Sequence, residues 1–162
     1  MANPVVINRH FLTLGNLLKS ENLTDKPGTI FNVDESGMNL ELNLDGNYSA
    51  SGPTDAVYGK SDNGYMDEDL FFKWFTRLFV PKTKHLGKRI LIIDGHGSHI
   101  NLNLIDAAME NQVILYCLPP HTTHVLQPLD VGLYGPLKTY FSRITDKIHI
   151  ARLGITEMLQ FN

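Results

Sequence analysis

The run Arg-Ile-Leu-Ile-Ile at residues 89–93 limits more than any other feature how this chain can fold. Four of its five side chains are large and apolar, and three of them are β-branched, so the run has no polar face. Such a run predicts a strand covered on both faces, as in a sheet between layers of helices. Further apolar runs at 29–33 and 112–118 predict a second strand and another buried strand.

Apolar residues at helical spacing surround these strands. They predict helices over residues 4–20, 67–79, 100–110 and 130–147. Leu40, Leu42 and Leu44 alternate with polar residues and predict one more strand, and the Gly-, Ser- and Asn-rich stretch 45–64 predicts a loop. The apolar face of helix 67–79 is expected in the core. The order of elements predicts an α/β fold with a mixed sheet and flanking helices.

Composition excludes several classes of protein. No apolar run approaches the roughly 20 residues of a membrane helix, and no basic leader with an apolar stretch opens the chain, so we expect no secretory signal. Cys117 is the single cysteine and cannot form an internal disulfide. Because it lies in an apolar run, we expect a small buried side chain. These features indicate the cytosol or the nucleus.

The formal net charge of −3 gives no sign of nucleic-acid binding. Basic residues nevertheless gather in two places, and we expect most of them to form solvated faces, with phosphate contact as the alternative. The two groups are Lys82, Lys84, Lys88 and Arg89, and Lys138, Arg143, Lys147 and Arg152.

Three aspartates stand where predicted elements begin or end. Asp34 and Asp94 each follow an apolar strand, and Asp130 opens a helix after a turn. Converging carboxylates would repel each other, and a bound divalent cation with oxygen ligands, such as Mg²⁺, removes that cost. Spacing alone leaves the alternatives of a turn residue at Asp34, a turn start at Asp94 and a helix cap at Asp130.

The local sequences around these aspartates resemble a known family. Three segments resemble, in this order, the three aspartate motifs of the DDE-1 superfamily of endonucleases. They are Ile-Phe-Asn-Val-Asp-Glu-Ser-Gly (30–37), Leu-Ile-Ile-Asp-Gly-His-Gly-Ser-His-Ile (91–100) and Tyr-Cys-Leu-Pro-Pro-His-Thr-Thr-His-Val-Leu-Gln-Pro-Leu-Asp-Val-Gly-Leu-Tyr-Gly-Pro-Leu-Lys (116–138). The 35 residues between Asp94 and Asp130 are similar to the family's spacing. The resemblance covers most of residues 29–142, within a single partial domain over residues 1–162.

The resemblance to pogo, Tigger and Jerky-like proteins implies a ribonuclease-H-like fold and transposase chemistry on DNA. It implies phosphodiester cleavage and strand transfer that depend on Mg²⁺ or Mn²⁺, with two ions when active. Asp34, Asp94 and Asp130 would be both catalytic residues and metal ligands, with Glu35 a neighbour. A nuclear location, a DNA partner and no membrane are implied, and an oligomer is possible.

The chain also departs from the family pattern. Only 59 residues lie between Asp34 and Asp94, fewer than in family members, so central strands of the sheet are expected to be missing. Residues 38–44 are the available remnant. The alternative function is therefore a catalytically inactive, domesticated or decayed nucleic-acid-binding domain.

Two His-x₂-His pairs add candidates, namely His96 with His99 and His121 with His124. Four imidazoles could form a tetrahedral zinc site. The resemblance instead implies that they orient loops, contact DNA or hydrogen-bond the metal ligands. Ser98 lacks a Gly-x-Ser-x-Gly elbow, which argues against a serine hydrolase.

Overall fold

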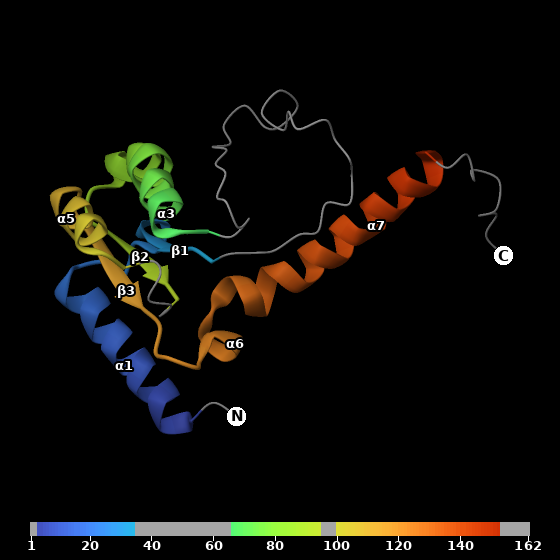
Figure 1. Ribbon diagram of the computed structural model, residues 1–162. Helices are drawn as coiled ribbons and strands as arrows, with labels where there is room; N and C mark the ends of the chain where they lie inside the picture. Colours follow the sequence, from blue (N-terminus) through green and yellow to red (C-terminus); the bar gives the residue numbers. More distant parts are fainter. Residues whose placement is uncertain (1–2, 35–65, 95–99, 153–162) are drawn as a thin grey trace.

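Three parallel strands form the centre of the computed structural model, which describes residues 3–34, 66–94 and 100–152 (Figure 1). They are β1 (Ile30–Asn32), β2 (Arg89–Ile93) and β3 (Val113–Cys117), in the order β1-β2-β3. This confirms the α/β class. The described sheet is wholly parallel, so the mixed sheet that the sequence predicted has no antiparallel member within these ranges.

The central strand β2 is buried at all five positions, as its sequence predicted. The expectation of another buried strand at 112–118 was wrong in its burial, because β3 is buried only at Val113, partly buried over the next three residues and exposed at Cys117. The physical reason is position, since β3 has a neighbour on one side only among the described strands. Apolar composition alone does not separate a central strand from an edge strand.

One face of the sheet is covered by a helical segment with three parts, α3 (Glu68–Trp74), the π-helical turn η2 (Phe75–Phe79) and α4 (Val80–Thr83). The helix begins as predicted, because the Asp67 carboxylate caps it by accepting from the Leu70 N–H at 2.8 Å. Its expected apolar stripe is confirmed as core. Phe71, Phe75 and Phe79 pack with Leu91 and Ile93, the side chains that β2 directs to this face.

Helix α5 (Leu102–Glu110) joins β2 to β3 on the same face. Leu104 and Ala108 belong to the same apolar cluster, while the Asn101 side chain caps the helix by accepting from the Leu104 N–H at 2.9 Å. The predicted helix 100–110 is thereby confirmed with a later start.

The opposite face carries α1 (Pro4–Ser20), whose bounds match the predicted 4–20 (Figure 1). Ile7, Leu14 and Leu18 pack against a second apolar cluster that includes Ile90 and Ile92. Phe11 shares their spacing in the sequence, yet it is 58% exposed. The neighbouring residue, His10, is buried instead.

His10 joins α1 to β3 through a polar contact inside this second layer. Its Nδ1 atom lies 3.0 Å from the hydroxyl of Tyr116, and that hydroxyl also lies 3.3 Å from the His10 carbonyl oxygen. Burial lowers the pKa of His10 below its usual 6.5 because the charged imidazolium is desolvated. The fold therefore favours the neutral imidazole.

A pH dependence of stability follows from this histidine. The folded state binds fewer protons than the unfolded chain, so the contribution is fully present above about pH 6.5 and is lost as the pH falls below it. We expect urea midpoints measured from pH 7.5 to pH 5.5 to fall more steeply for the unmutated chain than for His10→Gln. Parallel curves for the two proteins would contradict this assignment.

The remaining described segments are short connections and one long helix. Turns η1 (Pro27–Thr29) and η3 (Lys84–Leu86) precede β1 and β2, and α6 (Thr123–Leu126) with the π-helical turn η5 (Asp130–Tyr134) follows β3. Helix α7 (Gly135–Arg152) then extends away from the sheet (Figure 1), confirming the predicted helix 130–147 and lengthening it. Of the helices in the described ranges, none has the length and apolar content needed to cross a membrane.

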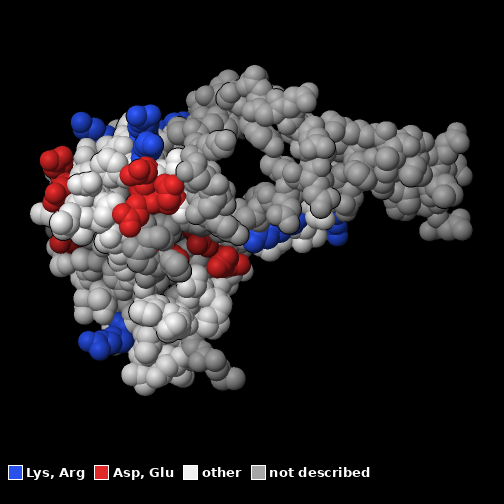
Figure 2. Space-filling model, viewed as in Figure 1, with Lys and Arg blue, Asp and Glu red and all other residues white. Residues whose placement is uncertain are grey.

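The basic side chains of the two groups noted in the sequence differ in their exposure to solvent. Lys138 and Arg143 are exposed on α7, where blue side chains lie along the described surface of the helix (Figure 2). The expectation of a solvated face was wrong for Arg89, which is 1% exposed. Its guanidinium donates to the Thr83 hydroxyl at 2.7 Å and to the carbonyls of Gly87 and Asn111 at 2.8 and 2.9 Å. These bonds replace water at Nε and Nη1, while Nη2 is buried without a hydrogen-bond partner.

Several predictions lie outside the described residues and stay predictions. They concern the alternating strand at Leu40, Leu42 and Leu44 with its remnant 38–44, the loop at 45–64, and Glu35. His96 and His99 lie in the segment 95–99, which the structure does not describe.

Candidate functional site at the carboxyl edge of the sheet

Asp34 and Asp94 lie at the carboxyl ends of neighbouring parallel strands. The register pairs Asn32 with Ile92, and each aspartate follows two residues later on its own strand. The pairing continues past the regular strand, because the Val33 N–H donates to the Ile92 carbonyl at 3.0 Å. Both aspartates are therefore at the same level of the sheet edge, and both are partly buried.

Strand alternation, carried past the ends of β1 at Asn32 and β2 at Ile93, predicts that the two aspartates share one face. Side chains two residues apart on a strand share a face. Asp34 is therefore expected on the face of Asn32, and Asp94 on the face of Ile92. Ile92 packs in the cluster beneath α1 and α6. The candidate site thus lies at the carboxyl edge, where open parallel sheets commonly bind ligands.

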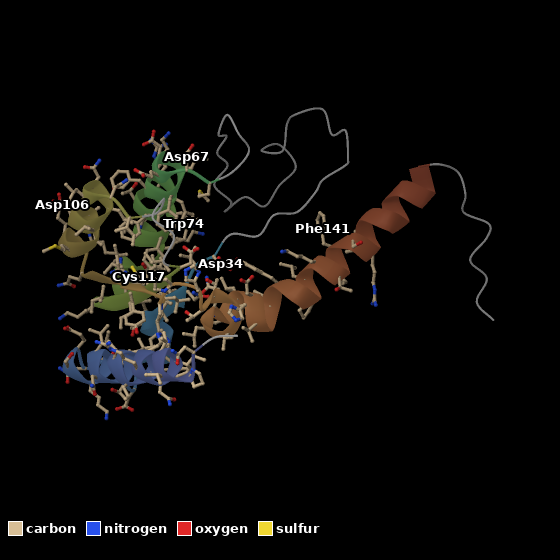
Figure 3. The ribbon with its side chains drawn as sticks, turned by 60° about the horizontal axis from the view of Figure 1, so that its bottom comes forward. Asp34, Asp67, Trp74, Asp106, Cys117 and Phe141 are labelled. Carbon is tan, nitrogen blue, oxygen red and sulfur yellow. The ribbon has the colours of Figure 1, made fainter. Side chains whose placement is uncertain are left out.

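Asp130 begins the turn η5 and is exposed. Its segment lies beside Asp34, because the Tyr134 hydroxyl donates to the main-chain carbonyl of Asp34 at 2.5 Å. Figure 3 shows Asp34 where the sheet meets the start of η5 and α7. Within the described ranges, no group of three or more His, Cys, Asp or Glu side chains is arranged to hold a metal ion.

The second histidine pair is described and lies near the start of the same segment. His121 is exposed with a positive φ of 61°, and His124 is exposed on α6. Their proposed partners His96 and His99 lie outside the described residues. A role for any of the four in orienting loops, contacting DNA or binding zinc therefore stays a prediction.

Cys117 ends β3 at the same edge, and the expectation that it is buried was wrong. The pKa of its thiol is raised, first by partial desolvation and then by the negative charge of Asp94. The strand register explains the second cause, because Ile93 pairs with Cys117 and Asp94 is the next residue after Ile93.

Sequence reasoning gave no role to Gln127, although the structure places it at the centre of this edge. Gln127 is 0% exposed. Its Oε1 accepts from Asn32 Nδ2 at 2.8 Å, and its Nε2 donates to the Val33 carbonyl at 3.0 Å. The signal in the sequence was a polar residue between Leu126 and Pro128. When an amide side chain is buried, it usually has hydrogen-bond partners.

The comparison with known families identifies the family of the chain. The family model described as DDE superfamily endonuclease matches residues 42–155, more than two thirds of the chain. The chain belongs to the DDE superfamily of endonucleases. Asp94 and Asp130 lie inside the matched region of this DDE endonuclease chain, and Asp34 precedes it.

A curated relative is also similar to this DDE superfamily chain. The protein named MFS-type transporter clz9, from Cochliobolus lunatus, is 34% identical over 117 residues. The aligned segment is 70% of this chain and 13% of that protein, so the chain spans a small part of its relative's length. No solved structure matches the chain.

Proposed function

We propose that this chain is a transposase-derived, metal-dependent endonuclease domain that cleaves and transfers phosphodiester bonds of DNA in the nucleus. The observation that carries the proposal is the shared level of Asp34 and Asp94 at the carboxyl ends of adjacent strands. Membership of the DDE endonuclease family supports the reaction class. The family membership and the site geometry rest on different observations.

The donor chemistry of the edge suits Mg²⁺ or Mn²⁺. Two carboxylates offer the hard oxygen ligands that these ions prefer, and such ions keep open positions for water and phosphate. In the proposal, Asp34 and Asp94 hold the ions and Asp130 completes the set. When bound, a pair of such ions would activate an attacking water or DNA 3′-hydroxyl and stabilise the leaving oxygen.

The chain's own residues do the remaining work. The strand pairing holds the main chain of Asp34 and Asp94 in place, so the carboxylates need little ordering when an ion binds. The exposed Lys138 and Arg143 of α7 lie on the segment that follows Asp130, where cations can contact backbone phosphates. His121 and His124 are exposed candidates for DNA contact in the same region.

A non-catalytic nucleic-acid-binding domain is the second candidate. It is favoured by one observation, namely the short interval of 59 residues between Asp34 and Asp94. In this candidate, α7 would bind phosphate while the sheet edge binds no ion.

Calorimetric titration with Mn²⁺ separates the two candidates. We expect the unmutated chain to bind Mn²⁺ and Asp94→Asn to lose at least about 10-fold in affinity, because the substitution removes a charged ligand. Asp106→Asn is the matched control, since Asp106 is an exposed acid on α5, away from the edge (Figure 3). A folded chain that binds no Mn²⁺ would leave the non-catalytic candidate.

A further inference from the structure

Two consecutive main-chain carbonyls of β1 and its extension are held by side chains from one short segment. The Val33 carbonyl accepts from Gln127 Nε2 at 3.0 Å, and the Asp34 carbonyl accepts from the Tyr134 hydroxyl at 2.5 Å. These carbonyls belong to the peptides on either side of the Asp34 α-carbon. Gln127 and Tyr134 therefore hold the main chain from which the Asp34 side chain extends.

Asp130 lies between these two anchors in the sequence. The Gln127 main-chain carbonyl accepts from the Val131 N–H at 3.1 Å, which joins Gln127 to the first turn of η5. Tyr134 is the last residue of η5. We name Gln127 and Tyr134 the β1 clamp, because together they connect the turn that begins with Asp130 to the strand end that carries Asp34.

The burial of Gln127 makes the connection specific. A fully buried amide needs a partner for its oxygen and its NH₂ group, and leaving either one unpaired is costly. Both are paired here, the oxygen with Asn32 and the NH₂ with the Val33 carbonyl. A shift of β1 relative to residues 127–134 would break both bonds, so the amide selects one register between the two segments.

We propose that Gln127 is a positioning residue, which with Tyr134 sets the placement of Asp130 relative to Asp34. This inference rests on the proposed function, because the placement matters for metal binding only when both carboxylates are ligands. Neither anchor carries a charge, and neither needs to touch the ion. Their effect passes through the main chain of β1 and the turn η5.

The test compares three single variants of the full chain, together with the double variant of Gln127 and Tyr134. Gln127→Met keeps the length of the side chain and removes both amide bonds, while Tyr134→Phe removes one hydroxyl. Tyr116→Phe is the control, since it also removes one tyrosine hydroxyl that joins a helix to the sheet. The lost contact is with His10 of α1 and not with the end of β1. Urea unfolding measures how much stability each variant loses, so that effects on the site are compared at known stability.

Mn²⁺ affinity, measured by electron paramagnetic resonance, is the first readout. We expect Gln127→Met to weaken binding by about 10- to 100-fold, the range seen when residues that orient metal ligands are replaced. Tyr134→Phe should weaken it less, and the double variant should fall short of the product of the two effects, because both act on one connection. An affinity for Gln127→Met equal to that of Tyr116→Phe would overturn the proposal.

Hydrogen exchange in metal-free protein is the second readout, and it does not depend on the proposed function. Gln127→Met should speed exchange at the amides of Asp34 and Val131 relative to Tyr116→Phe, because the clamp is released. If the unmutated chain binds no Mn²⁺ but this difference is seen, the clamp stands and the endonuclease proposal fails. Equal exchange in the two variants would refute the clamp whatever the metal result.

Discussion

Replacing Asp34 with asparagine is expected to lower Mn²⁺-dependent nicking of supercoiled DNA by at least about 100-fold. We expect the same loss of nicking activity for Asp94→Asn. Even residues that only orient ligands cost 10- to 100-fold, so a ligand itself should reach the upper end of that range. Asp34 precedes the region matched by the family model. The prediction therefore comes from the strand register, which puts Asp34 level with Asp94.

The Asp34 substitution is conservative for the fold. Asparagine keeps the size of the side chain, and the bond from Tyr134 goes to the main-chain carbonyl, which is unchanged. Asp106→Asn on α5 is the matched control and should retain full nicking activity. If Asp34→Asn nicks DNA as fast as this control does, Asp34 is not part of the catalytic site. Asp94 would then have no catalytic partner at the end of β1.

Replacing Phe75 with alanine is expected to cost about 3–5 kcal/mol of unfolding free energy. Phe75 is 0% exposed and packs between the sheet and the helical layer, where its ring lies 5.6 Å from that of Phe79 in a stacked arrangement. Removing the ring leaves a cavity at the centre of the larger apolar cluster. Urea unfolding followed by circular dichroism measures the loss, which is a large part of the stability of an ordinary domain.

Phe11→Ala is the control, because it makes the same substitution at an exposed position. Phe11 is 58% exposed on α1, and we expect its removal to alter the unfolding free energy by no more than about 0.5 kcal/mol. A small effect at both positions would show that the layer of α3 and η2 does not pack on the sheet as described. A large effect at both would place Phe11 in the core.

Much of the fold could be predicted because the strongest signals in the sequence are local. The run at 89–93 has no polar face, so its burial on both faces could be predicted, and Pro4 with the apolar spacing that follows predicted α1 at its observed bounds. The exposure of Cys117 and the burial of Arg89 were missed. Both depend on which element ends up beside the residue, since β3 is an edge strand and the carbonyls of Gly87 and Asn111 surround Arg89.

The position of Asp34 and Asp94 at the carboxyl edge of the sheet could be predicted for the same reason. A strand end followed by aspartate is visible in the sequence, and parallel pairing brings two such ends together. The role of Gln127 was not visible, because its partners Asn32 and Val33 are 95 and 94 residues away. No periodicity records a contact over that distance. The metal, the DNA partner and the roles of the four histidines rest on the proposal and its experiments.

The order of the strands also has a consequence for synthesis on the ribosome. Asn32 bonds to Ile92, 60 residues later, and at roughly 5–20 residues per second that partner follows after about 3–12 seconds. The hydrogen bond to the Asp34 carbonyl forms later still, because its donor Tyr134 is synthesised 100 residues after Asp34. The N-terminal strand therefore leaves the ribosome well before its β2 partner, and nascent chains arrested before residue 94 should be the ones that chaperones retain.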